Sequence, residues 1–447
     1  MGHTIRYAFI TFLSLLFISS ITIAKPSYTE EGDMEQKSKS KQGVEIEKDS
    51  FINKISLDGE LKNEESFYSL SDSKLNQDNR LRLPTMESIS MASLAPKVIL
   101  GEESFLKGLI SAEYNLQKNG HTKEDKEIKI KEFYLSTAYR KIALEIGRER
   151  VRWGVGYCAS PTDVVTDMRR PGDPEDRLNR VKGADLAKMD ILFKDSSLIL
   201  VYLPDLEVKE GDINNHSGAM KYSFFINRFD VATVLRIGED KKATAGINLS
   251  YVIGEALEVH GEFLWSRKQE AVSPDYYNGT DALYNKPPYK IKDNPAYYTI
   301  LGGQYTLKIN EENALNIVLE YYRNGDGLSR DEIAALNDHI EYSYELSAEQ
   351  GYYQLLWATN VYRFPLGTNY LFLRFDYPFF EDKLRAELNT LYSLTDSSFF
   401  SQPILTWDVN DALSLSIRCA TSYGDDNSEA YLSPIKYVMR MGGTYHF

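Results

Sequence analysis

Apolar and polar residues alternate with a period of two along most of the chain from residue 52 onward. The clearest examples are the segments 257–265, 371–377, 384–394 and 413–419. This period predicts β-strands with one apolar and one polar face, because successive side chains of a strand point to opposite sides. A helical period occurs chiefly at 329–339, where Ser329 and Glu332 form a capping box. The pattern predicts an all-β protein with short helical turns in its loops.

The predicted strands are joined by connections of two kinds. Short polar turns occur at 194–196, 227–228, 310–313 and 408–411, and long polar loops occur at 151–184, 267–296 and 324–351. Such alternation is typical of outer-membrane β-barrels, with the turns in the periplasm and the loops outside. No apolar run among these strands approaches the length of a membrane-spanning helix. A secreted β-sandwich or another soluble all-β fold is the alternative.

The strand count contains an inconsistency. We find about nineteen candidate strands, including weak ones at 54–68 and 80–90. A single-chain barrel with both ends in the periplasm has an even number of strands. The suspect segment is 352–377, where Phe364-Pro365-Leu366-Gly367 is either a break inside one strand or a true turn. We therefore predict an antiparallel transmembrane β-barrel of about 18 strands, with roughly 16 to 20 as the range.

The first 50 residues differ from the rest of the chain. Arg6 precedes an apolar stretch at 8–23, and Thr22-Ile23-Ala24 has the small-x-small form of a cleavage site. We predict a signal peptide at 1–24, with a transmembrane anchor as the alternative. Residues 25–50 are rich in Glu, Lys, Ser and Gln and predict a disordered periplasmic tail. The barrel is expected at 51–447.

The last strand has its own pattern. One face carries Tyr437, Met439, Met441, Gly443, Tyr445 and Phe447. This face resembles the terminal strand of bacterial outer-membrane proteins, in which a final Phe with apolar residues at alternating positions is the assembly signal. The resemblance implies recognition by the barrel-assembly machinery through Tyr437, Met439, Met441, Tyr445 and Phe447.

An arginine-rich stretch ends an early strand. Arg148, Arg150 and Arg152 alternate after Gly147, in continuation of the apolar face formed by Ile142, Leu144 and Ile146. Because arginine costs about 2–4 kcal/mol at the bilayer midplane, two arrangements are open. We favour a bulge at Gly147 that turns the arginines into the lumen. The alternative places them above the hydrocarbon, beside lipid phosphates.

The loop that follows has features of helix starts. Ser160 is a candidate N-cap, Pro161 suits the first helical position and Asp163 stands where a capping-box acid would. The same pattern recurs at 173–176, so we expect two short helical turns before Asp185. The candidate lumen and constriction residues are Arg148, Arg150, Arg152, Asp163, Asp167, Arg169, Arg170, Arg177 and Arg180. A structural salt-bridge network is the alternative role for these charges.

The same stretch carries a resemblance. Residues 147–156 read Gly-Arg-x-Arg-x-x-Trp-Gly-x-Gly, and Pro-Thr-Asp follows at 161–163. Together with Gly59 and Asn79-Arg80-Leu81-Arg82-Leu83, they resemble a motif set of a largely uncharacterised family of porin-like outer-membrane barrels. Alginate-export barrels are a looser comparison. The resemblance implies a barrel and transport, without indicating a substrate.

Composition excludes several classes of function. The net charge of -14 argues against nucleic-acid binding, which needs a basic footprint. Cys158 and Cys419 are too few for a disulfide framework. One bridge between them is the alternative, and we expect two free thiols. The 31 tyrosines suit strands with one wet and one interfacial face.

Enzymatic and metal-binding functions are weakly supported. The histidines His3, His121, His216, His260, His339 and His446 are scattered, with no spacing suited to zinc. His260 lies beside Glu258 and Glu262, and Ser250 is a candidate nucleophile for a barrel hydrolase, but a lumen histidine without a catalytic role is favoured. The acidic loops at 324–327 and 425–429 match no full calcium-binding pattern and are interpreted as turns. We expect no enzyme activity, cofactor or metal.

These observations predict a porin-like channel in the outer membrane of a Gram-negative cell, for passive diffusion of small hydrophilic solutes. An export or surface-assembly barrel, for instance for polysaccharide, is one alternative, and a structural or adhesive barrel is another. The expected partners are outer-membrane lipid and lipopolysaccharide, the barrel-assembly machinery and the solutes themselves.

Overall fold

The structure is a computed structural model. It describes residues 52–71, 73–79, 81–118, 122–166, 171, 181–204, 216–238, 243–267, 272–274, 289–292, 294–311, 313–362 and 364–447. The chain divides into two compact units, 1–42 and 43–447, and every described residue belongs to the second. The predicted signal peptide at 1–24 and tail at 25–50 lie outside the described residues.

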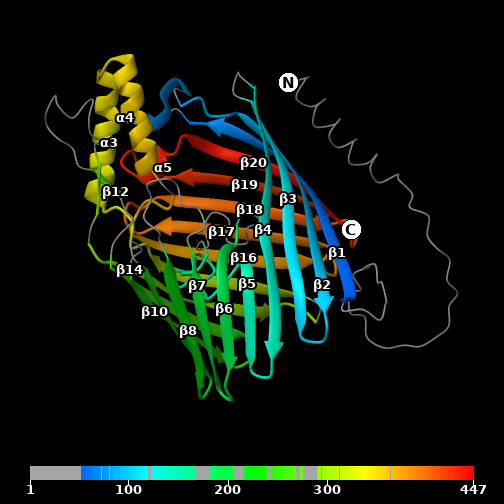
Figure 1. The fold of residues 1–447 in the computed structure, drawn as a ribbon. Coiled ribbons are helices and arrows are strands. Elements are labelled where there is room, and N and C mark those ends of the chain that lie inside the picture. The colour runs from blue at the N-terminus through cyan, green and yellow to red at the C-terminus, as the bar shows by residue number, and fades with distance from the viewer. Residues whose placement is uncertain are drawn as a thin grey trace, which may run out of the picture. The chain divides into compact units, whose positions relative to one another are not determined.

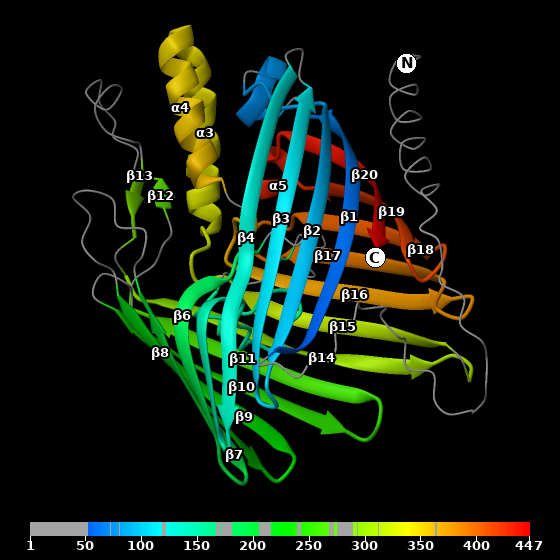
Figure 2. The ribbon, with the colours of Figure 1, turned by 45° about the vertical axis from the view of Figure 1, so that its right-hand side comes forward.

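Eighteen strands form one closed antiparallel barrel. They are β1 (Ile52–Leu70), β2 (Met86–Leu100), β3 (Ser104–Lys118), β4 (Thr122–Tyr139), β5 (Ile142–Glu149), β6 (Ala184–Leu192), β7 (Ser196–Leu203), β8 (Ser217–Ile226), β9 (Phe229–Gly238), β10 (Thr244–Ile253), β11 (Leu257–Ser266), β14 (Ala296–Lys308), β15 (Ala314–Arg323), β16 (Asn369–Phe379), β17 (Leu384–Ser393), β18 (Phe399–Asp408), β19 (Leu413–Tyr423) and β20 (Ile435–His446). Each barrel strand pairs with the next along the chain, and β20 pairs with β1 to close the ring (Figures 1 and 2). The predicted fold class is confirmed.

The remaining elements lie in the connections. β12 (Val272–Pro274) and β13 (Tyr289–Ile291) form a separate two-stranded sheet between β11 and β14. The connection from β1 to β2 contains the 3-10 segment η1 (Lys74–Asn79), the connection from β15 to β16 contains α3 (Arg330–Glu345) and α4 (Ala348–Val361), and the connection from β19 to β20 contains α5 (Glu429–Leu432). Figure 2 shows α3 and α4 side by side, standing beyond the ends of the strands. Within the described residues, no helix is long and apolar enough to cross a membrane.

The two faces of the wall differ, as the period of two predicts. In β15, Leu319 is more than half exposed, whereas its neighbours Val318 and Glu320 are buried. Leu144 and Ile146 of β5 are likewise exposed. Since apolar residues on the outside of a barrel face lipid, the outer face is suited to a bilayer and the inner face holds the polar groups.

The segment that made the strand count odd is helical. Residues 352–361 belong to α4, and Phe364-Pro365-Leu366-Gly367 connects this helix to β16. The helix predicted at 329–339 is confirmed as α3, which begins at Ser329 with the predicted capping box and extends to Glu345. Apolar side chains of α3 and α4 pack against one another in one buried cluster. This packing stabilises the pair of helices, and α4 does not need to pair with a barrel strand. The weak candidate strand predicted at 80–90 is only partly confirmed. The observed strand β2 begins at Met86, and residues 81–85 precede it.

The predicted assembly face of the last strand points outward. Tyr437, Met441, Tyr445 and Phe447 are all exposed, whereas Val438 on the opposite face is buried. Met439 shares this outward register. The strand is held on one side by β19 and on the other by β1, so these residues lie where the barrel closes.

Candidate functional site

The segment between β5 and β6 folds into the barrel, and we refer to its residues 150–166 as the inner loop. Its Trp153, Cys158 and Ala159 are almost fully buried, although the loop forms no helix or strand. One apolar cluster joins Trp153 to inner residues of β6 to β9, β11 and β14. A second cluster joins Cys158 and Ala159 to β14 to β17. The inner loop therefore packs against the inner face of the wall on one side of the barrel.

Six consecutive backbone N–H groups of the inner loop, at 153–158, donate in pairs to three carboxylates. The first pair uses an acid of the loop itself: Trp153 and Gly154 donate to Oδ1 of Asp163, at 2.5 and 2.8 Å. An ionised carboxylate accepts several hydrogen bonds, and such charge-assisted bonds are stronger than neutral ones. Asp163 thus replaces the secondary structure that would otherwise satisfy these groups.

The second pair is anchored to the wall at β11. The N–H groups of Val155 and Gly156 each lie 2.6 Å from Oε1 of Glu262. Oε2 of the same carboxylate accepts from the N–H of Thr162 at 3.0 Å and from its hydroxyl at 2.7 Å. A Cβ atom at Gly156 would lie 2.3 Å from the carbonyl oxygen of Ala159, so this motif position has no room for a side chain. Glu262 therefore fixes both ends of the turn.

The third pair is anchored to β15. Tyr157 and Cys158 donate to the two oxygens of Glu320, at 2.7 and 2.6 Å. Nε2 of His260 lies 2.7 Å from the same carboxylate, and both side chains are fully buried. Burial raises the pKa of the Cys158 thiol well above its usual range, with the charge of Glu320 as a smaller cause. Glu262 and Glu320 thus position the inner loop and are not free charges of the passage.

The carbonyl groups of the inner loop are also bonded to the wall. The Trp153 carbonyl accepts from the Asn248 amide at 2.7 Å and from Nζ of Lys221 at 3.4 Å. The guanidinium of Arg236 donates to the Val164 carbonyl. Polar contacts from β8 to β11 and β15 therefore complete the attachment that the apolar clusters begin.

The predicted helix start at Ser160 is wrong. Residues 160–166 contain a turn and no helix. The Ser160 hydroxyl donates back to the Gly156 carbonyl at 3.1 Å, and Asp163 accepts from Trp153 and Gly154, so neither side chain caps a helix. The second predicted start, at 173–176, lies outside the described residues.

The predicted bulge at Gly147 is also wrong. The pairing of β5 with β4 and with β6 runs through Gly147 without a change of register. Gly147 has φ +136° and lies opposite Tyr134, and a Cβ atom there would lie 2.3 Å from the Phe133 carbonyl oxygen. Arg148 consequently lies on the outer face of β5, beyond Ile146. The prediction that Arg148 faces the lumen is therefore wrong. Arg148 binds Asp185 with two bonds of 2.8 and 2.6 Å.

Arg150 and Arg152 lie inside the barrel, because the strand ends at Glu149 and the alternation stops there. Arg150 binds Glu132 of β4 at 2.8 Å, and Arg152 binds Asp163 at 3.3 Å. The arginine side chains are 26% and 30% exposed, whereas those of the two acids are 6% and 1% exposed. In each pair the cation is therefore more exposed inside the barrel than the anion.

Two other ion pairs of the inner wall have the same arrangement. Lys107 is 39% exposed beside the buried Glu132, at 3.3 Å, and Arg440 is 28% exposed beside the buried Glu64, at 3.7 Å. Sequence reasoning missed these residues, although their inward positions in alternating strands were available as a signal. The remaining candidates, Asp167, Arg169, Arg170, Arg177 and Arg180, lie outside the described residues.

The arrangement does not support a hydrolase. Ser250 and His260 are cross-strand partners, as a nucleophile and a base would be. Within the described structure, however, Nδ1 of His260 has no hydrogen-bond partner, so it does not accept a proton from Ser250. The described residues also contain no group of three His, Cys, Asp or Glu placed to hold a metal ion. The two cysteines are free, as expected.

The acidic loops act as structural links. Asp326 accepts from the Tyr298 hydroxyl at 2.7 Å, and the Asn324 amide donates to the carbonyls of Pro365 and Gly367. In the other loop, the buried Glu429 accepts from the N–H of Leu366 at 2.6 Å. Both acidic loops thus form hydrogen bonds to the segment 365–367, which precedes β16.

No family model and no curated protein sequence matches the chain. Solved structures match over nearly its whole length. OccAB1 of Acinetobacter baumannii has a TM-score of 0.56 at 7% identity, covering 91% of this chain and 99% of that chain. OccK5 (OpdH) of Pseudomonas aeruginosa has a TM-score of 0.52 at 10% identity, covering 89% and 99%. OccK11 (OpdR) of the same organism has a TM-score of 0.52 at 11% identity, covering 88% and 96%. The chain therefore has the fold of outer-membrane porins.

Proposed function

We propose that this protein is an outer-membrane channel for passive diffusion of small hydrophilic solutes, with its narrowest part at the inner loop. The observation that carries the proposal is the attachment of that loop. Six successive N–H groups, at 153–158, are fixed by Asp163, Glu262 and Glu320, so the constriction has a defined width. A preorganised wall of this kind selects solutes by size and charge.

The charge preference follows from the exposed member of each ion pair. The side chains of Arg150, Arg152, Lys107 and Arg440 are between 26% and 39% exposed, whereas those of their carboxylate partners are at most 6% exposed. The field in a narrow passage is set mainly by the nearest exposed charges, because water screens the more distant ones. We therefore expect a preference for anionic solutes despite the net charge of -14.

Single-channel recording in planar bilayers tests the proposal. A steady, voltage-independent conductance at low voltage supports a diffusion channel. Absence of conductance from correctly folded barrels would favour an export, assembly or adhesive barrel. A folded preparation is recognised by its heat-modifiable migration, so a silent channel is distinguished from a misfolded one.

Several further assignments belong to the same proposal. Residues 1–24 act as a cleaved secretion signal and 25–50 as a periplasmic tail, and Tyr437, Met439, Met441, Tyr445 and Phe447 form the contact with the barrel-assembly machinery. The exposure of this outer face where β20 meets β1 supports that role. The motif at 147–156 marks membership of the porin-like family that it resembles. Lipopolysaccharide and outer-membrane phospholipid surround the apolar outer face. Fractionation of cell envelopes tests the location.

A further inference from the structure

A cavity of about 370 Å³ lies at the end of the barrel that carries α3, α4 and α5. The wall contributes residues of β18, β19 and β20, among them the buried Gln402 and Val438. The connections contribute Tyr362 and Phe364, between α4 and β16, and residues of the segment 429–435, which includes α5. We refer to this space between the wall and the connections as the loop-end cavity.

The loop-end cavity is rich in aromatic rings. Tyr362 and Phe364 of the connection and Phe399 and Phe400 of β18 all line it. The rings of Phe364 and Phe400 lie 5.1 Å apart between centroids and are tilted by 48°. Phe364 and Phe399 are each 37% exposed, so they offer ring surface to a ligand. Aromatic side chains bind flat rings through burial of apolar surface and through stacked or edge-to-face contacts.

The two charged groups of the lining already have partners. Glu429 accepts from the N–H of Leu366 at 2.6 Å and from the Tyr370 hydroxyl at 2.8 Å. Arg440 lies 3.7 Å from Glu64. One carboxylate and one guanidinium also cancel in formal charge. Because burial of a charge without an opposite partner is costly, the loop-end cavity favours an uncharged ligand.

Most hydroxyl groups of the lining are also bonded within the protein. The Ser398 hydroxyl donates to Asp396 at 2.7 Å. Three further hydroxyls donate to backbone carbonyls, and they belong to Tyr362, Thr421 and Ser433. A solute with many hydroxyl groups would therefore meet few free donors in the loop-end cavity.

The amide group of Gln402 provides an acceptor that is not used within the protein. Gln402 is 1% exposed, and its Oε1 has no hydrogen-bond partner within the described structure. A buried acceptor without a donor destabilises the protein, so a donor from a ligand is favourable there. The last side-chain torsion of glutamine has a broad range, so the amide can turn toward the cavity without leaving its rotamer.

We propose that the loop-end cavity binds an uncharged, flat ring compound with one N–H or O–H donor, such as an indole or a phenol. The aromatic side chains contact the ring of the ligand, and Oε1 of Gln402 accepts its hydrogen bond. Pockets for small molecules have roughly 300–1,000 Å³ and combine apolar walls with a few polar groups, as this cavity does. The site is distinct from the inner loop and does not depend on the proposed channel function.

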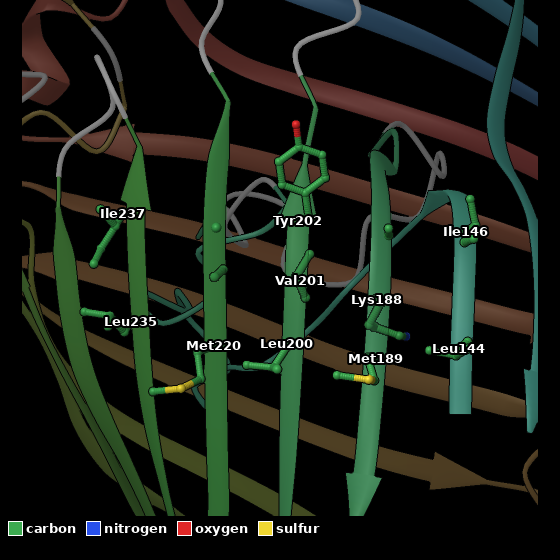
Figure 3. Close-up of a pocket in the computed structure, with 13 residues that line it drawn as sticks. Leu144, Ile146, Lys188, Met189, Leu200, Val201, Tyr202, Met220, Leu235 and Ile237 are labelled. Carbon is green, nitrogen blue, oxygen red and sulfur yellow. The ribbon is translucent and has the colours of Figure 1, made fainter. Parts of the chain in front are cut away.

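A second cavity, on the outer face of β5 to β9, has a different character. Figure 3 shows Met189 and Met220 on either side of Leu200, and the cavity of about 500 Å³ is lined chiefly by apolar side chains. On the outside of a barrel such a surface faces acyl chains. Gly218 lines this outer cavity, and a Cβ atom there would meet only the Val201 carbonyl oxygen, at 3.9 Å. Gly218→Leu therefore fills it without strain and serves as a control for general apolar binding.

Calorimetric titration of the full-length protein in lipid nanodiscs, with empty nanodiscs as the blank, tests the proposal. The probes are indole and 1-methylindole, which lacks the donor. We expect the wild type to bind indole roughly fivefold more tightly, and Gln402→Leu to bind both probes equally. The matched control is Asn389→Leu, because Asn389 pairs with Gln402 across β17 and β18 and is equally buried but does not line the cavity. Phe364→Ala should weaken the binding of both probes.

Four outcomes would overturn the proposal. They are equal affinity of the wild type for the two probes, tighter binding of indole-3-carboxylate than of indole, equal loss of indole binding in Gln402→Leu and Asn389→Leu, and loss of indole binding in Gly218→Leu. Heat-modifiable migration checks that each variant is folded, and Gln402→Met, with a side chain of similar length, replaces Gln402→Leu if the latter does not fold. Because the titration measures binding alone, a barrel without conductance would count against the channel function only.

Discussion

The aromatic ring of Phe447 lies over Gly59, the residue with which its backbone exchanges two hydrogen bonds. The Gly59 N–H donates to the Phe447 carbonyl at 2.8 Å, and the Phe447 N–H donates back at 3.0 Å. A Cβ atom at Gly59 would lie 2.3 Å from Cζ of the ring. The two ends of the barrel sheet therefore join through a ring that needs a glycine beneath it, as in other sheets where an aromatic residue covers a glycine.

Substitution at either position should weaken closure of the barrel. Gly59→Leu displaces the ring, and Phe447→Ala removes it, with an expected cost of about 0.5–1.5 kcal/mol for the ring contact. Thermal unfolding followed by heat-modifiable migration measures this loss. His446→Ala is the control, because that exposed side chain lies on the opposite face. Equal unfolding temperatures for all three variants would show that the ring contact does not stabilise closure.

The inner loop should loosen when Glu262 is neutralised. In Glu262→Gln, one amide oxygen replaces a carboxylate that accepts four hydrogen bonds, and a charge-assisted bond is worth about 1.5–3 kcal/mol. We expect a larger and noisier single-channel conductance. Glu258→Gln is the matched control, because Glu258 shares the inward face of β11 but makes no hydrogen bond or ion pair with the described part of the inner loop. An unchanged trace in Glu262→Gln would argue against anchoring by this residue.

Cys158 reports the same attachment independently. The thiol is fully buried and burial raises its pKa, so the reactive thiolate is scarce and inaccessible. In a Cys419→Ser background, a membrane-impermeant maleimide should leave Cys158 unlabelled in folded barrels. Glu320→Gln, which weakens the bonds to Tyr157 and Cys158, should raise the labelling rate. Rapid labelling without that change would contradict the burial of the loop.

A pH effect is expected where the long loops meet. Burial, and then the neighbouring Asp396, raises the pKa of Glu429 to about 7. Because the folded state binds the proton more tightly than the unfolded state, this group favours folding below pH 4.5 and loses that effect as pH rises to about 7. The loss is at most roughly 3 kcal/mol. Burial lowers the pKa of His339 to about 4, so this residue acts in the opposite direction as pH falls below 6.5.

Amide exchange at Leu366 and Gly367, which donate to Glu429, measures this effect locally. After correction for intrinsic exchange, protection should fall between pH 5.5 and 8 in the wild type. Glu429→Gln should show little dependence on pH in this range, because it lacks the carboxyl group whose ionisation causes the effect. The same pH dependence in both proteins would exclude Glu429 as its origin.

The fold could be predicted because its signals are local. Period-two alternation and short turns specify strands and their connections without knowledge of distant residues. The prediction failed at 352–361, where an apolar run fits a strand or a helix equally well until α3 provides an apolar surface for it. Length and pattern alone do not separate these two choices.

The site could be predicted only in part. The arginine stretch was recognised, but the end of β5 at Glu149 decides which arginine faces which side, and alternation does not reveal that end. The carboxylates that hold the inner loop could not be predicted from the sequence. Glu262 lies 106 residues from Gly156, and Glu320 lies 163 residues from Tyr157. Such contacts depend on the register of the whole barrel.

The reversal potential in a potassium chloride gradient tests the central claim most directly. The account predicts an anion-preferring wild type and a clear shift toward cations in Arg150→Gln/Arg152→Gln, since these arginines are the exposed members of their pairs. Arg148→Gln, on the outer face of the same stretch, should keep the wild-type value. An unchanged reversal potential in the folded, conducting double variant, or an equal shift in Arg148→Gln, would contradict the account.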